Sequence, residues 1–591
     1  MSGRSRRWLG RVESRRWPCY AAVIAFAPVA LAYLWTHPFP ALGGGLYLHM
    51  AETIAAHGYG LPVRIPHYTA GGLPFGYPPL MLYVAGALLD LGAPPLALAR
   101  SLPVALVAAA LVAYAVAAAA LLDSRPQGAF AAVVVATSPP VLHLTLTAGG
   151  TVRAAALLFV SAGIYAVVRL FRTGSRTWLL AAAGLFGATL LTHPLYTVFF
   201  GTSSLVLYAG LDRTPTGLVR GAIVAVGGLL VAAPWWTSVA ATHGIELFGR
   251  ASATHGGLGY PGWYARFPEV TAPLVSPWPA LAWLGAAHLL LDRRWILPAW
   301  FVAVGLLTGR DEFLALVGAM MAAAVLFEAI VPALKRTTEV SWALARAALG
   351  RAAFARAARL RSVGPRVGVV ALLVLSTYGV ASASTYAAGG GAGDDLPMFV
   401  RSADLGAMEW ARTETGRNAS FVVLGSVAEW FPLFAHRTNL VVPQGSEWDR
   451  RTGRARQIHL RAALSRCADA GCLTARFERT GLAPTHVYLP RAGYGVGAAE
   501  RRWNSLRPSL RRSPNYTVVY ESRAALVAQT SAGAPNGSRA DARREARTPR
   551  PASRRARRAA HGWPHSPSTA AGGNRSDARS TRAAAAALDR R

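Results

Sequence analysis

The segment Leu98–Leu122, LARSLPVALVAAALVAYAVAAAALL, has a single charged residue in 25 positions. A helix that crosses the hydrocarbon core of a bilayer needs about 20 predominantly apolar residues, so this run predicts a transmembrane helix. Of the 591 residues in the chain, 53% are hydrophobic and 15% are charged. This composition is unusual for a soluble enzyme, and it indicates an integral membrane protein.

Eleven further apolar runs, all of which begin before residue 390, extend this pattern. They are Pro18–Trp35, Pro78–Leu91, Ala129–Leu146, Val152–Phe171, Trp178–Leu191, Leu195–Leu211, Leu218–Ala240, Thr271–Leu291, Trp295–Leu307, Phe313–Leu334 and Val367–Tyr386. The first run fits either a retained helix or a cleaved signal peptide, and the many later runs favour a retained helix.

Charged loops predict the orientation of these helices, because Arg and Lys concentrate on the cytoplasmic side of a membrane. Six Arg precede the first run and place the N-terminus in the cytoplasm. The same side is expected for the basic segments, which are 169–176, 212–220, 292–294 and 335–366. The outside is expected for the remaining loops, which are 147–151, 241–270 and 308–312, and for everything after Tyr386.

The number of crossings follows from this orientation. A cytoplasmic N-terminus and an outside C-terminal domain require an odd number of crossings, yet there are twelve runs. Either Pro78–Leu91 is a short or re-entrant helix that does not cross the membrane, or one of the runs contains two crossings. The sequence therefore predicts 11 to 13 spans in a multi-pass protein of the plasma membrane.

The fold class predicted is an all-α polytopic membrane domain followed by a small α/β soluble domain. Its parts are a basic N-terminus (1–17), a transmembrane domain (18–388) with a long first outside loop (36–77), an extracytoplasmic soluble domain (389–530) and a disordered Arg-rich tail (531–591). In the soluble domain, apolar patterning predicts strands at Phe421–Leu424, Leu440–Val442, Val487–Leu489 and Thr517–Tyr520, and helices at Asp404–Thr413 and Gln457–Cys467.

The formal net charge of +33 does not indicate a nucleic-acid partner. Arg supplies all but one of the basic residues, and an excess of Arg, Ala and Gly is typical of GC-rich coding sequences. Eight basic residues lie in the segment 335–366 and fourteen Arg lie in the tail. Both stretches are expected to be solvated or to lie on the membrane surface.

Three cysteines are too few for a disulfide framework or a multi-Cys metal site. Cys19 lies in the first apolar run, where it is expected to be a small core residue. Cys467 and Cys472 lie in the soluble domain, where they can form a disulfide or remain two free thiols.

The first outside loop is long, and long loops inside compact domains usually carry function. Residues Leu46–His57 can form a helix on the membrane surface, with His49 and Glu52 one turn apart on the same face. This pair is either a general base or metal-ligand pair, or part of a solvated helix face. The loop ends in Phe75-Gly76-Tyr77-Pro78-Pro79-Leu80, where Pro suits the first turn of the next helix.

These features together resemble the GT-C superfamily of membrane glycosyltransferases, which includes the protein mannosyltransferases, the aminoarabinose transferases and the oligosaccharyltransferase catalytic subunits. The similar features are the long first loop with its helix, the Tyr-Pro-Pro-Leu segment, the many spans and the trailing soluble domain. Shorter similar segments are Leu191-Thr192-His193-Pro194-Leu195, Ala233-Pro234-Trp235-Trp236, Gly309-Arg310-Asp311-Glu312-Phe313, Ala428-Glu429-Trp430-Phe431 and Gly445-Ser446-Glu447-Trp448.

The resemblance implies transfer of a sugar from a polyprenyl-phosphate carrier to a glycan, lipid or protein acceptor at the outer membrane face. An Arg there would hold the phosphate, and an acid would act as a base or bind a divalent cation such as Mg²⁺ or Mn²⁺. On this basis, the candidate catalytic residues are Glu52, His49 and Asp311, the candidate substrate-binding residues are Arg310, Arg153, Tyr77 and His193, and the candidate metal ligands are Asp311 and Glu312.

Each of these candidates has a structural alternative. Arg310 can instead extend toward lipid headgroups, and Asp311 and Glu312 can instead mark a helix N-terminus, where the helix dipole favours acids. His193 can be a residue at a helix break.

The sequence departs from the resembled family at two positions. The family places an acid near the start of the first loop, where this chain has Ala41-Leu42-Gly43-Gly44-Gly45. The second acidic position is also empty, because Thr147–Arg153 contains no acid. A second hypothesis is therefore an inactive scaffold or lipid-binding subunit of the same fold. A transporter ranks third, because few charged residues lie within the runs.

Overall fold

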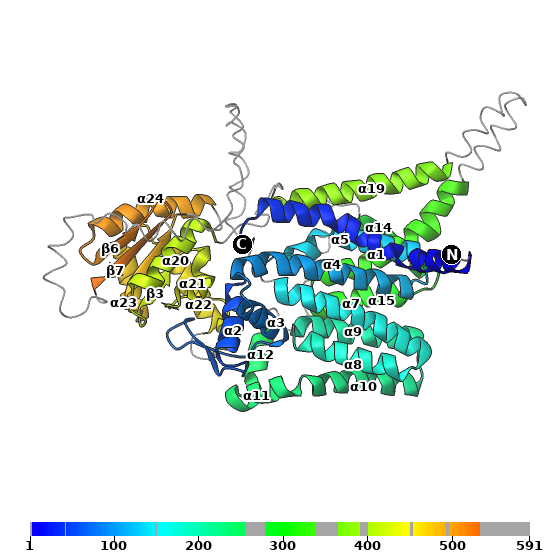
Figure 1. Cartoon of the computed structure of the whole chain (residues 1–591), viewed down its shortest axis with the longest axis horizontal. Helices are drawn as coiled ribbons and strands as arrows, with labels where there is room; N and C mark the ends of the chain where they lie inside the picture. Colours follow the sequence, from blue (N-terminus) through cyan, green and yellow to red (C-terminus); the bar gives the residue numbers. More distant parts are fainter. Residues whose placement is uncertain are drawn as a thin grey trace, which may run out of the picture. The chain divides into compact units, whose positions relative to one another are not determined.

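The computed structural model describes residues 3–41, 43–147, 150–253, 278–336, 364–389, 400–449, 453–491 and 496–531 (Figure 1). The described residues before 390 are mainly helical, and those from 400 onward form an α/β domain. The helices of the first part are α1 (Gly3–Thr36), α2 (Gly45–Ala56), α3 (Leu80–Asp90), α4 (Pro95–Leu121), α5 (Arg125–Ala136), α6 (Pro139–Thr145), α7 (Gly150–Thr173), α8 (Arg176–Leu190), α9 (Pro194–Leu211), α10 (Pro215–Val231), α11 (Ala233–His243), α12 (Glu246–Ala253), α14 (Trp278–Leu291), α15 (Ile296–Thr308), α16 (Asp311–Val325), the π-helical turn η1 (Leu326–Ile330) and α19 (Gly364–Ala387). Most of the predicted basic segment at 335–366 and of the tail lies outside the described residues.

Five helices in the described part of the chain are long and apolar enough to cross a membrane. They are Trp17–Thr36 within α1, α4, α7, α9 and the continuous helix Asp311–Arg336. Two bent helix pairs raise this number to seven if each pair is one span, and α3, α14 and α15 are shorter apolar helices. The multi-pass membrane class is therefore confirmed, and the number of 11 to 13 spans stays a prediction.

Two apolar runs that predict single helices are each broken by proline. The run Ala129–Leu146 divides into α5 and α6, which are bent by 61°, and Leu218–Ala240 divides into α10 and α11, which are bent by 58°. Ser138, just before Pro139, has extended backbone angles, as the residue before a proline prefers. Hydropathy alone does not reveal these breaks, because the residues around them are apolar.

The membrane helices pack closely where small residues face each other. Neighbouring pairs include α4 with α7, α7 with α8 and α8 with α10 (Figure 1). A Cβ on Gly187 would lie 3.0 Å from the Gly228 carbonyl oxygen, so α8 and α10 approach closely at these glycines. Lipid tails are as apolar as Leu, so packing of this kind is what holds membrane helices together.

The soluble domain contains a five-stranded mixed sheet in the order β4-β3-β5-β7-β6. Its strands are β3 (Ser420–Val423), β4 (Thr438–Asn439), β5 (His486–Pro490), β6 (Tyr516–Glu521) and β7 (Ala525–Thr530), and its helices are α20 (Ser402–Glu414), α21 (Phe431–Ala435), α22 (Arg454–Ser465), α23 (Ala470–Thr480) and α24 (Val496–Arg512), with the 3-10 turns η2 (Ser426–Glu429) and η3 (Ser446–Trp448). Strand β3 is parallel to β4 and β5, whereas β7 is antiparallel to β5 and β6.

Most of the strand predictions hold. Strands β3, β5 and β6 coincide with three predicted ones, and helices α20 and α22 with the two predicted helices. The predicted strand Leu440–Val442 is wrong, because the pairing residues are Thr438 and Asn439. Strand β7 was missed. Its residues Ala525–Ala528 are all buried, so it lacks the alternation of apolar and polar residues that marks a strand with one solvent-exposed face.

The two faces of the sheet are covered by different helices. Alternate residues of β3 and β5 pack against α22, α23 and α24 on one face, and the intervening residues pack against α20 and α21 on the other. Cys467, just after α22, and Cys472, in the first turn of α23, form a disulfide, which settles the alternative left open by the sequence.

The long first loop, residues 36–77, is folded rather than irregular. It contains the predicted helix, α2, and a short antiparallel pair of strands, β1 (Arg64–Ile65) and β2 (Leu73–Pro74). Leu46, Met50 and Ile54 of α2 are buried in one hydrophobic core with residues of α20 and α21. The loop and the soluble domain are therefore packed as one body.

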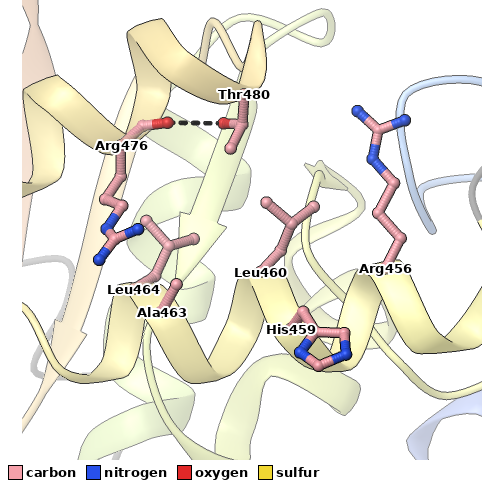
Figure 2. A pocket seen from close by; sticks show the side chains of 7 residues that line it. All are labelled: Arg456, His459, Leu460, Ala463, Leu464, Arg476 and Thr480. Atoms are coloured by element: carbon pink, nitrogen blue, oxygen red, sulfur yellow. Dashed lines mark hydrogen bonds between the residues drawn. The ribbon is translucent and has the colours of Figure 1, made fainter.

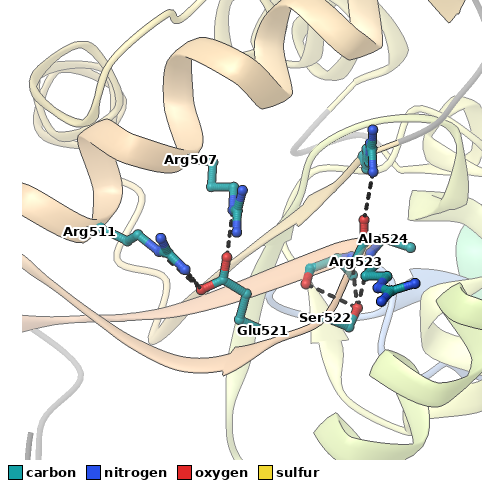
Figure 3. A network of polar contacts seen from close by, with 8 residues as sticks. Arg507, Arg511, Glu521, Ser522, Arg523 and Ala524 are labelled. Atoms are coloured by element: carbon teal, nitrogen blue, oxygen red, sulfur yellow. Dashed lines mark hydrogen bonds and ion pairs between the residues drawn. The ribbon is translucent and has the colours of Figure 1, made fainter.

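Glu521 of β6 binds Arg507 and Arg511 of α24, and it ties this helix to the sheet (Figure 3). Burial alone would raise the pKa of Glu521, but the two Arg outweigh it and hold the pKa below its ordinary value. The side chains are 20%, 37% and 50% exposed. We expect Glu521→Gln to lower the free energy of unfolding by roughly 0.5–1 kcal/mol, the upper range for exposed pairs.

This contribution is complete above the pKa of an unfolded glutamate, and it is lost as the pH falls through the lower folded pKa. Thermal unfolding of the full chain in detergent, at neutral and acidic pH, measures it. The matched control is Glu409→Gln, which removes an exposed pair with Arg412 on α20 and should change nothing. Equal shifts in both variants would contradict the expectation.

Candidate active site

Tyr47, Tyr77 and Arg153 come together from three separate elements. Tyr47 lies in the first turn of α2, Tyr77 precedes α3, and Arg153 lies in the first turn of α7. The two tyrosine rings meet edge to face, with 5.0 Å between their centroids, and the charge of Arg153 acts on both hydroxyls. All three residues are partly buried, and the Tyr77 hydroxyl is fully buried without a hydrogen-bond partner among the described residues.

The N-terminus of α16 contributes to the same place. Glu312 is 5% exposed and lies between the charges of Arg153 and Arg310. Tyr196 of α9 lies beside these three residues, and its buried hydroxyl has no hydrogen-bond partner within the described part of the chain. We call these four residues, together with Tyr47 and Tyr77, the Arg153 cluster.

The Arg153 cluster unites several residues that the sequence singled out. Arg153, Arg310 and Tyr77 were predicted to bind substrate, and Glu312 was predicted as a metal ligand. Tyr47 and Tyr196 were missed, because a tyrosine at helical spacing is usually a core residue and gives no signal of its own.

Glu429 of the soluble domain occupies the space above the glycine run of the first loop. The Gly44 N–H donates a hydrogen bond of 2.7 Å to Glu429 Oε1. A Cβ on Gly43 would overlap the Glu429 carboxylate, and a Cβ on Gly45 would lie 2.7 Å from the Glu429 carbonyl oxygen. Side chains at Gly43 and Gly45 would exclude this contact, so the glycines admit the glutamate.

Glu429 and Glu447 bring negative charge from the soluble domain toward Tyr47. Burial raises the pKa of the Glu429 carboxyl to about 7, against the opposing effect of the Gly44 and Leu46 N–H groups. Burial also raises the pKa of Glu447, which lies 3.5 Å from Arg454. A carboxyl group with a pKa near 7 exchanges protons readily at neutral pH.

His49 and Glu52 belong to a neighbouring polar group. His49 is 2% exposed, and its Nδ1 lies 3.3 Å from Glu52 Oε2. Glu52 also lies 3.6 Å from His436 of the soluble domain. Tyr68 connects this group to the acidic residues, because its ring lies 5.6 Å from His49 and its hydroxyl donates to the Glu429 carbonyl oxygen. The catalytic roles of His49 and Glu52 stay predictions.

His193 lies at the break between α8 and α9, where its extended backbone precedes Pro194. Its ring is 5.3 Å from the ring of Tyr196. His193 therefore adjoins the Arg153 cluster through Tyr196, and a role in substrate binding stays a prediction.

The positive charges of Arg153 and Arg310 act on Glu312 and weaken the attraction of this carboxylate for a divalent cation. The catalytic role of Asp311 and the metal-binding roles of Asp311 and Glu312 stay predictions. The described residues contain one group of three possible metal ligands, His288, Asp292 and Glu328, whose ligand atoms all lie within 4.8 Å of one another.

A hollow of about 280 Å³ lies between α22 and α23 in the soluble domain (Figure 2). Its lining residues are Arg456, His459, Leu460, Ala463, Leu464, Arg476 and Thr480. None of these belongs to the Arg153 cluster or to the acidic residues beside it.

Known proteins resemble the chain in fold but not in sequence. No protein-family model and no curated protein match the sequence. Among solved structures, ArnT from Cupriavidus metallidurans in the apo state covers 87% of this chain and 99% of its own, at 15% identity and a TM-score of 0.52. The same protein bound to undecaprenyl phosphate gives equal coverage, at 16% identity and a TM-score of 0.50.

The Archaeoglobus fulgidus oligosaccharyltransferase in complex with Zn and sulfate is also similar, at 11% identity and a TM-score of 0.49, over 79% of this chain and 67% of its own. At identities this low, likeness concerns the fold. The two ArnT structures confirm the predicted GT-C fold for this chain.

The pKa of Glu429 predicts a pH dependence of the contact between loop and soluble domain. A raised pKa means that the protonated form is favoured in the folded state. The stability that the protonated Glu429 carboxyl contributes is therefore complete below pH 4.5, the ordinary pKa of a glutamate, and is lost as the pH rises through about 7. We expect Glu429→Gln, which preserves the shape, to abolish this loss. Thermal unfolding at pH 5.5 and 8.5 tests it, and an unchanged slope in the variant would contradict it.

Gly43→Ala should disrupt the same contact, because the new Cβ overlaps the Glu429 carboxylate. We expect a loss of about 1–3 kcal/mol, typical of overpacking. Gly60→Ala is the control, since its Cβ would meet only the His57 carbonyl oxygen, at 3.4 Å. Thermal unfolding of both variants measures the difference, and equal stability would argue against a close contact at Gly43.

Proposed function

We propose that the protein transfers a sugar from a polyprenyl-phosphate-linked donor to an acceptor at the outer membrane face. The observation that carries the proposal is the Arg153 cluster beside the Glu429 carboxylate, at the end of a helix bundle with the GT-C fold. ArnT with this fold has been solved with undecaprenyl phosphate, which supports a lipid carrier of this chemical class.

Arg153 and Arg310 would bind the phosphate of the donor. Guanidinium groups form charge-assisted hydrogen bonds with phosphate oxygens, and two of them balance its charge. The hydroxyls of Tyr47, Tyr77 and Tyr196 supply further donors. The negative charge of Glu312 would balance part of the charge of the two Arg side chains when no ligand is bound.

Glu429 would act as the base. The acceptor hydroxyl attacks the anomeric carbon of the sugar and gives its proton to the Glu429 carboxylate, while the bond between that carbon and the phosphate oxygen breaks. The lipid phosphate leaves with the electron pair of that bond. This assignment supplies, from the soluble domain, the acid that the resemblance implies near Gly43 in the first loop.

The outer location rests on loop charge and on the disulfide of the soluble domain. The bond between Cys467 and Cys472 supports an oxidising compartment, and therefore the extracytoplasmic side. The inactive scaffold remains the second candidate function, because its support, the absence of an acid near the start of the first loop, is unaltered. A transporter is the third.

The experiment is a transfer assay with the full chain in detergent and a panel of radiolabelled polyprenyl-phosphate sugars. We expect Glu429→Gln to reduce the rate about 10²–10⁴-fold, as removal of a general base does. Arg153→Ala should reduce it roughly 10–100-fold, the loss of a hydrogen bond to a charged group. Arg172→Gln, on the other end of α7 and paired with Asp123, is the control and should leave the rate unchanged.

A double variant that moves the carboxylate from position 429 to position 43 tests the role of Glu429 more specifically. In Gly43→Asp combined with Glu429→Gly, the carboxylate returns to the first loop and the space for it is freed. We expect this double variant to recover part of the activity that Glu429→Gly alone loses. Activity that survives Glu429→Gln would refute the base, and no transfer by the unaltered chain from any donor would favour the scaffold. Glu52→Gln tests the earlier candidate in the same assay.

A further inference from the structure

A second group of ionisable residues lies at the other end of α16. His288 is in the last turn of α14, Asp292 directly follows that helix, and Glu328 lies on the π-helical turn η1. The positions of Glu312 and Glu328 along the helix differ by 16 residues, or about 24 Å at 1.5 Å per residue. This group is therefore separate from the Arg153 cluster.

Close helix packing brings these residues together. A Cβ on Gly285 would overlap the Met321 carbonyl oxygen, and a Cβ on Gly318 would lie 3.2 Å from the Ala282 Cβ. The two helices α14 and α16 therefore run in direct backbone contact toward His288 and Glu328. The π-helical turn interrupts the regular helix at Glu328, and such turns are frequent at functional sites.

The imidazole of His288 faces two carboxylates. Its Nε2 lies 3.6 Å from Asp292 Oδ2 and 3.5 Å from Glu328 Oε2. This nitrogen is buried, and its ion-pair partners among the described residues are these two carboxylates. Two carboxylate oxygens can lie around one ring nitrogen only if a proton or a cation lies between the nitrogen and the oxygens. The separations of 3.5 and 3.6 Å are long for hydrogen bonds.

The same separations suit a metal ion. Ligand bonds of about 2.0–2.2 Å at a tetrahedral angle place neighbouring ligand atoms roughly 3.3–3.6 Å apart. One imidazole nitrogen and two carboxylate oxygens suit Zn²⁺ and similar borderline ions better than Mg²⁺, which prefers oxygen alone. Gln127 donates a 2.9 Å hydrogen bond to Glu328 Oε1 and fixes the orientation of that carboxylate.

We propose that His288, Asp292 and Glu328 form a binding site for a divalent ion of the Zn²⁺ class, which joins the end of α14 to the turn after α16. Arg294 is the competitor, because its guanidinium also pairs with Glu328. The Arg294 side chain is 46% exposed and can turn toward solvent when an ion binds. The three residues leave a fourth position for water.

The test uses the full chain in detergent, stripped with EDTA, dialysed and given Zn²⁺. We expect Asp292→Asn and His288→Gln each to bind one equivalent fewer than the unaltered chain, and to lose the Zn²⁺-dependent rise in unfolding temperature. Asp292 is 52% exposed, so its substitution should not impair folding. Asp123→Asn, which removes another carboxylate paired with Arg, is the control and should bind as the unaltered chain does.

Arg294→Gln separates the metal site from a simple ion network. If a metal binds, removal of the competing charge increases Zn²⁺ affinity several-fold. If Glu328 serves only Arg294 and His288, the variant is less stable and gains no affinity. That second result, or equal Zn²⁺ binding by Asp292→Asn and the unaltered chain, would overturn the proposal. Arg153→Ala should bind Zn²⁺ normally, so the result is independent of the transfer assay.

Discussion

The hydrogen bond from the Gly44 N–H to Glu429 joins parts of the chain that are 385 residues apart. It is short and buried, and the hydroxyl of Tyr68 donates a further hydrogen bond to the carbonyl oxygen of the same glutamate. A buried carboxyl group is costly unless it is hydrogen-bonded, so the first loop and the soluble domain each depend on the other for this pairing. The hydrophobic core that they share supplies the rest of the adhesion.

Much of the fold could be predicted from the sequence, because the signals are local. Apolar length gives the membrane helices, and the pattern of Leu46–His57 gives the loop helix. The failures are also physical. Proline breaks such as Ser138-Pro139 lie inside apolar sequence, and the fully buried strand Ala525–Thr530 has no alternation to mark it.

Only some residues of the candidate site could be predicted from the sequence. Arg153, Arg310 and Tyr77 lie at helix starts on the side predicted to be outside, and loop charge with the GT-C resemblance was enough to select them. Glu429 was not selected. Its segment, Ala428-Glu429-Trp430-Phe431, resembles the family, but nothing in the sequence places this carboxylate beside the first loop. The first loop hints at it only through the run Gly43-Gly44-Gly45, which lacks the acidic side chain that the resembled family has there. A glycine run of this kind can therefore mark the place where an acid from another domain packs.

The chain order also determines when the site can exist. Arg153 and Tyr77 are synthesised early, and both can be in the membrane long before Glu429 emerges. If Glu429 is the base, the helix bundle alone can hold a lipid phosphate but cannot complete the reaction. The protein would then stay inert during membrane insertion, and it would become competent only when the α/β domain has folded and docked on the first loop. Late assembly of this kind would protect a lipid carrier from premature turnover.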